Sequence, residues 1–251
     1  DPATVAELIT INAATSGDVV LNAETNAANL GGSATDLAAA FDGINTSTGD
    51  LTITGNAATV AELITINAAT SGTFDPGANS KSAAYSDTAA NLISAFTGLT
   101  SHTGGLTISD TGPVSASALN IINTFKAAGT TTVTARSEIT GSSGEVETAL
   151  GAVTHGGAVN LTITSLGTIA ELKAINAATT GNIVLSQGSI VRNYSETAAD
   201  LAAAFDGITT STAMLTISGT TAASVPQLKT INDATIGTVA LNAETNAADL
   251  N

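Results

Sequence analysis

Fifteen residues of this chain occur twice. The stretch ATVAELITINAATSG fills residues 3–17 and returns unchanged at 58–72, which is 55 positions later. Two other segments recur at wider intervals: DLAAAFDGI at 36–44 and 200–208, and LNAETNAA at 21–28 and 241–248. These intervals are close to three and four times 55 residues. A repeat of about 55 residues therefore runs through the whole chain, which is typical of stacked supersecondary units.

The first half of each repeat predicts a helix followed by a strand. In TAADLAAAFDGI (197–208), the residues Leu201, Ala204, Phe205 and Ile208 have the spacing of one buried helix face. Gly207 before an apolar residue is typical of a left-handed helix cap. The strand alternates apolar and hydroxyl residues, as half-buried strands do. Its copies lie at 51–54, 106–109, 161–164 and 215–218.

The second half repeats this plan with a different helix. A threonine stands three residues before a glutamate, the spacing of a capping box at a helix start. The pairs are Thr4 with Glu7, Thr59 with Glu62 and Thr168 with Glu171, and Ser224 with Gln227 fits the same spacing. We expect Leu8 with Ile11, and Leu63 with Ile66, to form the buried stripe. Short apolar strands should follow at 19–21, 183–185 and 239–241. The copy at 115–134 lacks the capping acid and carries Phe125, so it is the most altered layer.

The order helix, strand, helix, strand predicts an α/β fold with parallel strands and right-handed crossovers. We interpret the chain as a solenoid of about nine coils, with roughly 27 residues per helix–strand pair, because one pair cannot bury its apolar face alone. One alternative folds each 55-residue unit as a single large coil with strands on two walls, and another is a doubly wound domain. The array begins with a half unit, 1–35, and continues with units at about 36–90, 91–144, 145–199 and 200–251.

Composition narrows the classes of function. The chain has 21 acidic and 6 basic residues, a formal charge of −15, which disfavours nucleic acid and anionic membrane surfaces as partners. It has no cysteine, and no apolar run reaches the length of a membrane span. No GxSxG, HExxH or phosphate-loop motif is present. Aromatic residues are 3% of the chain and tryptophan is absent, which weakens a sugar-stacking interpretation. We therefore expect no catalysis, no cofactor and no membrane insertion.

Two segments resemble repeats in very large secreted bacterial proteins. These are YSDTAANLISAF (85–96) and YSETAADLAAAF (194–205), each followed by LTISD or LTISG, and TIAELKAINAATTG (168–181) is similar to another such repeat. The proteins concerned are RTX-type adhesins and giant cell-surface proteins of cyanobacteria. The resemblance implies an extracellular or cell-surface location and a role in a surface layer, sheath, fibre or adhesin stalk. The GGxGxD calcium loops of RTX proteins are missing here, so that type of site is not carried over.

Two sets of ionisable residues could carry chemistry. His102 and His155, both expected in exposed loops, could share a metal or catalytic role, but without paired acids we interpret them as incidental. Acids recur near the predicted helix starts and could bind calcium along one edge, whereas capping and helix-dipole roles explain them without a metal. These acids are Glu7, Asp36, Glu62, Glu145, Glu171 and Asp200.

The hydroxyl residues of the LTIT-type strands could form an exposed rank, similar to the ice-contacting faces of some solenoid antifreeze proteins. Its members are Thr52, Thr54, Thr107, Thr162, Thr164 and Thr216, with Ser109 and Ser218. The other interpretation is that threonine suits exposed strand positions. If all strands share one sheet, the second-half strands should interrupt this rank.

The sequence thus predicts a non-catalytic extracellular structural module that self-associates or spaces other domains. The alternative is a binding module of an adhesin that recognises glycan or another surface, with the layer of Phe125 and Lys126 as the first place to test. Neither end of the chain reads as a polar cap. We expect the array to continue in a longer chain, or copies to associate end to end or laterally.

Overall fold

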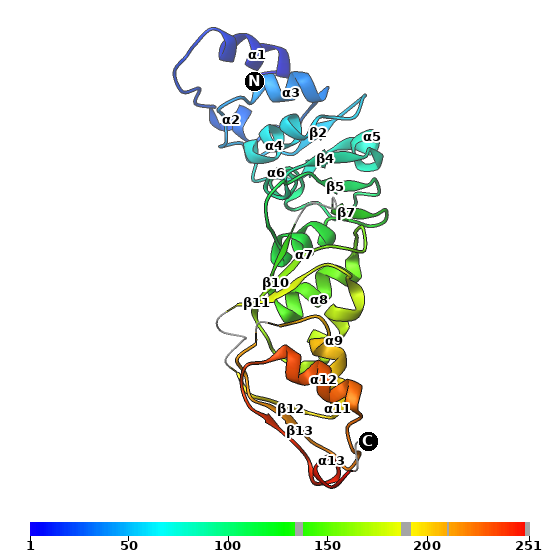
Figure 1. Cartoon of the computed structure of the whole chain (residues 1–251). Coiled ribbons are helices and arrows are strands. Elements are labelled where there is room, and N and C mark those ends of the chain that lie inside the picture. Colours follow the sequence, from blue (N-terminus) through cyan, green and yellow to red (C-terminus); the bar gives the residue numbers. More distant parts are fainter. Residues whose placement is uncertain (134–137, 187–191, 210, 249–251) are drawn as a thin grey trace. The chain divides into compact units, whose positions relative to one another are not determined.

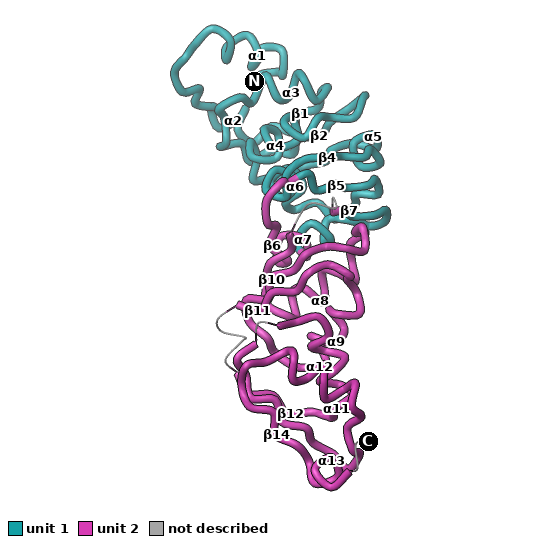
Figure 2. Tube along the Cα trace, viewed as in Figure 1, with its two compact units in different colours: residues 1–109, 121–132 teal, residues 110–120, 133–251 magenta. Residues whose placement is uncertain are grey.

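The computed structural model describes residues 1–133, 138–186, 192–209 and 211–248 (Figure 1). The chain divides into two compact units, coloured separately in Figure 2. Unit 1 comprises residues 1–109 and 121–132, and unit 2 comprises residues 110–120 and 133–251. Both units are α/β, with helices alternating with short parallel strands, as predicted. The last residues of the unit predicted at about 200–251, namely 249–251, lie outside the described residues.

Unit 1 is a run of helices that pack one on the next. Helix α1 contacts α3, α3 contacts α4, and α4 contacts α6 (Figure 1). Its strands lie in parallel sheets: one has the order β1-β2-β3, and in another β4, β5 and β7 are consecutive. The helices are α1 (Val5–Ala13), α2 (Ala23–Asn26), α3 (Ala34–Ala40), α4 (Val60–Ala69), α5 (Gly77–Ser82) and α6 (Ala89–Phe96), while α7 (Ala116–Thr124) has residues in both units. The strands are β1 (Leu30–Gly32), β2 (Leu51–Ile53), β3 (Phe74–Asp75), β4 (Tyr85–Asp87), β5 (Leu106–Ile108) and β7 (Thr131–Val133).

Unit 2 repeats this arrangement. Helix α8 contacts α9, α9 contacts α11, and α11 contacts α12. Its parallel sheets have the orders β6-β8-β10-β11 and β12-β13-β14. The helices are α8 (Ser143–Ala152), α9 (Ile169–Ala178), α11 (Ala198–Phe205), α12 (Val225–Ala234) and α13 (Ala243–Ala247). The strands are β6 (Val114–Ser115), β8 (Ile139–Ser142), β9 (Val153–Thr154), β10 (Leu161–Ser165), β11 (Ile183–Leu185), β12 (Tyr194–Glu196), β13 (Leu215–Ile217) and β14 (Val239–Ala240).

The predicted buried face of the first-half helix is confirmed in α11. Leu201, Ala204, Phe205 and Ile208 are all buried. Gly207 has a φ of 72°, the left-handed conformation expected of a helix cap. The LTIT-type strands also form where predicted, as β2, β5, β10 and β13. Their apolar residues face the core, because alternate side chains of a strand point to opposite faces.

The second-half helices begin at the predicted capping boxes. In α1, α4 and α9 a threonine hydroxyl accepts from the glutamate amide, and the glutamate carboxylate accepts from the threonine amide. At the start of α12, Gln227 Oε1 accepts from the Ser224 amide at 2.9 Å. These contacts satisfy amide groups that the first helical turn leaves without partners.

Two expectations for the first repeat were wrong. Residues 19–21 form no strand, and Val20 is 88% exposed. The equivalent strands β3, β11 and β14 each pair with an LTIT-type strand of the preceding layer, and no such strand lies among the described residues before 19. Ile11 is 48% exposed although its equivalent Ile66 is fully buried. Among the described residues, no layer precedes α1 to cover Ile11.

Short helices divide the second-half strands, which the sequence did not indicate. Helix α5 separates β3 from β4. As a result, β3 pairs with β2, the strand before it in the chain, and β4 pairs with β5, the strand after it. A buried hydroxyl in each short helix accepts a backbone N–H from the preceding layer. The pairs are Thr25 with Ala3 at 2.9 Å, Ser80 with Ala58 at 3.0 Å and Thr245 with Ala223 at 2.7 Å.

The two copies of the fifteen-residue stretch provide a matched test of interlayer packing. A Cβ atom built on Gly72 would lie 2.6 Å from the Gly49 carbonyl oxygen, a distance that requires the backbone to move. The same atom on Gly17 meets nothing closer than 3.5 Å. We expect Gly72→Ala to lower the free energy of unfolding by about 1–3 kcal/mol. Gly17→Ala should change it by less than about 1 kcal/mol. Urea denaturation of the two variants measures both values, and equal effects would contradict the close approach.

Candidate functional site

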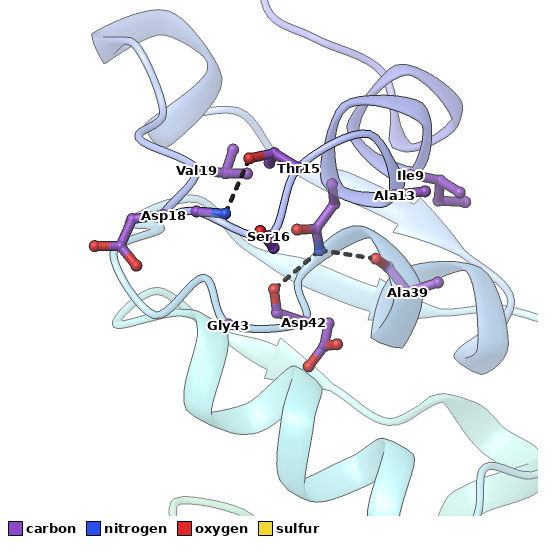
Figure 3. Close-up of a pocket in the computed structure, with 11 residues that line it drawn as sticks. Ile9, Ala13, Thr15, Ser16, Asp18, Val19, Ala39, Asp42 and Gly43 are labelled. Atoms are coloured by element: carbon purple, nitrogen blue, oxygen red, sulfur yellow. Dashed lines mark hydrogen bonds between the residues drawn. The ribbon is translucent and has the colours of Figure 1, made fainter.

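Two grooves occupy equivalent places in consecutive repeats of unit 1. The first has a volume of about 490 Å³ and lies between the C-terminal ends of α1 and α3 (Figure 3). The second has a volume of about 710 Å³ and lies between the C-terminal ends of α4 and α6. Ile9, Asn12, Thr15 and Gly17 in the first groove correspond to Ile64, Asn67, Thr70 and Gly72 in the second. Each groove is therefore a product of the repeat.

An asparagine side chain joins the two helices at each groove. Asn12 Nδ2 donates to the carbonyl oxygens of Ala39 at 3.1 Å and Asp42 at 2.9 Å (Figure 3). Asn67 Nδ2 in α4 donates in the same way to the C-terminal end of α6. Its partners there are the carbonyl oxygens of Ser94 at 3.2 Å, Ala95 at 3.4 Å and Thr97 at 3.0 Å.

The same contact occurs in unit 2. Asn176 Nδ2 of α9 donates to the carbonyl oxygens at the end of α11, namely Ala203 at 3.2 Å, Ala204 at 3.1 Å and Asp206 at 2.9 Å. The last carbonyl groups of a helix have no partner within the helix, and the primary amide supplies the donors. The sequence analysis missed this role, although the asparagine that recurs in every INAAT segment was a visible signal.

The charges around the grooves differ between copies. Asp18 and Asp42 line the first groove, and their carboxylates point away from one another (Figure 3). Thr73 and Thr97 replace them in the second groove. What the two grooves share is an amide already engaged with carbonyl groups, together with hydroxyl and apolar side chains. This lining suits a neutral polar ligand or simple hydration, and it brings no acid–base pair together.

The acids predicted near helix starts act on their own helices. Capping hydrogen bonds from backbone amides lower the pKa values of Glu7, Glu62 and Glu145. Asp200 Oδ2 accepts from the hydroxyl of its N-cap residue Thr197 at 2.7 Å, while a hydrogen bond from Lys173 Nζ of α9, at 2.6 Å, lowers the pKa of Asp200. Asp36 Oδ2 accepts from the Ser33 hydroxyl at 2.7 Å. The capping interpretation of these acids is therefore supported directly by their contacts.

Some capping acids also contact the preceding helix. Glu62 Oε1 accepts from the Thr35 hydroxyl of α3 at 2.8 Å, and Glu171 Oε2 accepts from the Ser143 hydroxyl of α8. Successive helices are thus connected by side-chain hydrogen bonds of two kinds. Carboxylates near the N-termini join α3 to α4 and α8 to α9, and asparagines near the C-termini join α1 to α3, α4 to α6 and α9 to α11. Across the described ranges, no group of three or more His, Asp or Glu residues is placed to hold a metal ion. Calcium binding remains a prediction.

The prediction that both histidines lie in exposed loops was wrong for His102. It is 1% exposed, because its ring packs among Tyr85, Phe96 and other residues of unit 1. His155 is half-buried in unit 2. The two histidines belong to different units.

The hydroxyl residues of the proposed rank lie on the outer faces of their strands, and each side chain is exposed or half-buried. The four strands belong to four different sheets, however, so the rank is divided. The register neighbours of Thr52, for example, are Gly31 and Asp75, while Thr162 lies between Thr140 and Val184. The placements concern Thr52, Thr54, Thr107, Thr162, Thr164 and Thr216, with Ser109 and Ser218.

Comparison of the chain with known proteins identifies no family for it. No model of a known protein family and no curated protein sequence matches the chain. Among the helices that the structure describes, none is long and apolar enough to cross a membrane.

The asparagine contacts can be tested with a matched pair in unit 2. Asn176→Ala removes the amide that serves the last carbonyl groups of α11, and we expect the free energy of unfolding to fall by about 1–2 kcal/mol. Asn232 has the same place in α12 but is exposed, and its side chain makes no hydrogen bond to the described residues. Asn232→Ala should therefore change stability by less than about 0.5 kcal/mol. Urea midpoints followed by circular dichroism compare the two variants, and equal losses would show that the interhelical contact contributes little.

Proposed function

We propose that the chain is a non-catalytic structural repeat module that folds as a solenoid of stacked helix–strand coils. In this role it would space other domains or form part of a surface layer, sheath, fibre or adhesin stalk. The proposal includes contacts between copies, end to end or lateral, as the means of building such a structure. It places the protein outside the cell or on its surface, in line with the resemblance to repeats of giant secreted bacterial proteins.

One observation carries the proposal. The same asparagine contact joins successive helices in α1–α3, α4–α6 and α9–α11, and its donors and acceptors are always 27 to 30 residues apart. The polar side chains that recur with the repeat are thus engaged in holding one layer to the next. A chain whose recurrent polar side chains hold successive layers together can be lengthened by adding further layers.

The alternative is a binding module of an adhesin that recognises glycan or another surface. The two equivalent grooves favour this alternative, because a repeated hydroxyl and amide lining could engage successive units of a polymer. Their differing charges at Asp18 and Asp42 against Thr73 and Thr97 favour the structural role, because the layer contact persists while the lining changes. Deletion of one repeat distinguishes the two functions.

Removing residues 18–72 joins Gly17 to Thr73 and deletes one complete 55-residue repeat without creating a new junction sequence. We expect this variant to fold cooperatively, with unchanged proportions of helix and strand. Its radius of gyration should be smaller, as measured by small-angle X-ray scattering. These results follow if one layer can substitute for another at each interface.

The control removes residues 18–58, which is not a whole number of helix–strand pairs, and joins Gly17 to Thr59. It should lose cooperative unfolding, because helix α1 would run directly into a second helix start. Glycan-array binding and sedimentation of the intact chain and the 55-residue deletion complete the test. Glycan binding by the intact chain that disappears with one repeat would identify a binding module. Failure of the in-phase deletion to fold would overturn the solenoid.

A further inference from the structure

The layer of unit 1 that includes Phe125 and Lys126 contains a histidine in its core. His102 packs against Phe96 with ring centroids 4.8 Å apart and against Tyr85 with centroids 5.7 Å apart. Tyr85 meets Phe96 at 5.4 Å, and Phe96 stacks on Phe125 at 6.4 Å. His102 is 1% exposed, and both ring nitrogens are buried without a hydrogen-bond partner among the described residues. Such burial of an unpaired polar group is costly, and more so when the group is charged.

Two of the equivalent layers contain a serine in place of this histidine, and a third has Gly157. Ser47 bridges to Thr70, Ser211 bridges to Thr235, and His102 bridges to Lys126 in the same way. Ser47 and Ser211 are as buried as His102, at 1% and 0% exposure. In unit 2 the pair Tyr194–Phe205, with centroids 6.0 Å apart, therefore has a small neutral hydroxyl where the corresponding pair in unit 1 has an imidazole.

The neighbouring positions change together with the histidine. Phe125 stands where the other layers have Ala69 and Ala234. Lys126 replaces Thr70 and Thr235, whose hydroxyls donate to carbonyl oxygens of the preceding layer at 2.6 and 2.7 Å. Three substitutions, Ser to His, Ala to Phe and Thr to Lys, thus convert an ordinary layer into one with a titratable aromatic core.

The groups around the imidazole disfavour its protonated form. Burial lowers the pKa of His102 below its ordinary value of 6.5, and the positive charge of Lys126 lowers the pKa further. The backbone of Ser80 acts in the opposite direction and more weakly, and neither ring nitrogen makes a hydrogen bond to the described residues.

Other ionisable groups on the surrounding elements do not compensate a charge on His102. Burial raises the pKa of Tyr85 on β4, so this phenol stays neutral near pH 7. Lys81 of α5 is 2.9 Å from Asp75 of β3, while the carboxylate of Glu62 on α4 acts on Tyr85. Among the described residues, no carboxylate pairs with the imidazole.

We propose that the layer of His102, Phe125 and Lys126 is an acid-sensitive element of unit 1, held closed by a neutral imidazole and opened when that imidazole is protonated. A histidine whose protonated form is disfavoured in the folded state stabilises the fold fully above about pH 6.5, where the unfolded chain is also neutral. Below that pH the unfolded or opened state takes up a proton first. The opening equilibrium constant should then rise by up to about tenfold per pH unit.

The carboxylates respond in a separate pH range. Capping hydrogen bonds lower the pKa values of Glu7, Glu62 and Glu145 from the ordinary glutamate value, so these carboxylates keep their charge between pH 7 and pH 5. Histidine is the side chain whose ordinary pKa lies in this interval. Acid sensitivity between pH 7 and pH 5 can therefore be assigned to a histidine, and variants at the two histidine positions identify which one.

Native-state hydrogen exchange with mass spectrometry, at pH values from 7.5 to 5 and corrected for intrinsic rates, tests the proposal. Peptides from residues 97–109 and 121–132 should lose protection, by about tenfold in opening constant, as the pH falls from 6 to 5. Peptides from residues 198–236, which contain Ser211, provide an internal control and should keep theirs. The triple variant His102→Ser, Phe125→Ala, Lys126→Thr restores the ordinary layer and should remove the pH dependence, whereas His155→Ser should leave it unchanged.

A second measurement does not depend on how the triple variant folds. The imidazole signals of His102 in the unaltered chain, followed by NMR through the same titration, should stay those of a neutral ring to below pH 6 in the folded state. Protonation of His102 at or above pH 6.5 would overturn the proposal. So would pH dependence that persists in a folded triple variant, or that disappears with His155→Ser.

Discussion

The packing of each helix against the helices before and after it is the interaction on which the structure depends. A helix such as α4 buries Leu63 and Ile66, and it does so between α3 and α6. The strands cannot replace this contact, because most of them are two or three residues long and several pair with a neighbour on one side. Stability in each unit is therefore a property of neighbouring layers and not of single coils.

Side-chain hydrogen bonds at the helix ends fix how the layers meet. A carboxylate such as Glu62 caps its own helix and also contacts Thr35 of the preceding helix. An asparagine such as Asn67 serves the final carbonyl groups of the following helix. Apolar stripes alone allow neighbouring helices to slide, since hydrophobic contact has no direction. The directional contacts, one kind to the preceding helix and the other to the following helix, set the register, which explains why a chain with few charged residues keeps these particular polar positions.

The layer around His102 shows how such an array can acquire a new property without changing its architecture. Its backbone bridge from His102 to Lys126 matches the bridges from Ser47 to Thr70 and from Ser211 to Thr235. The side chains have changed while the main-chain contacts remain. Repeated layers tolerate this because each contacts its immediate neighbours, so a substitution in one layer does not spread through the whole core.

The sequence by itself determined the local elements. Capping boxes, the alternating LTIT-type strands and the cap at Gly207 all depend on residues close together in the chain, and the structure has them where they were predicted.

The tertiary structure alone decided which residues are buried when that depends on a neighbouring layer. Identical copies show this most directly: Ile11 is exposed and Ile66 is buried, and Gly17 is open while Gly72 touches the preceding layer. The roles of Asn176 and His102 were hidden for the same reason, because their partners lie about 20 to 30 residues away on adjacent layers. Local sequence specifies a helix or a strand, whereas burial and interlayer hydrogen bonds depend on which layer lies beside it.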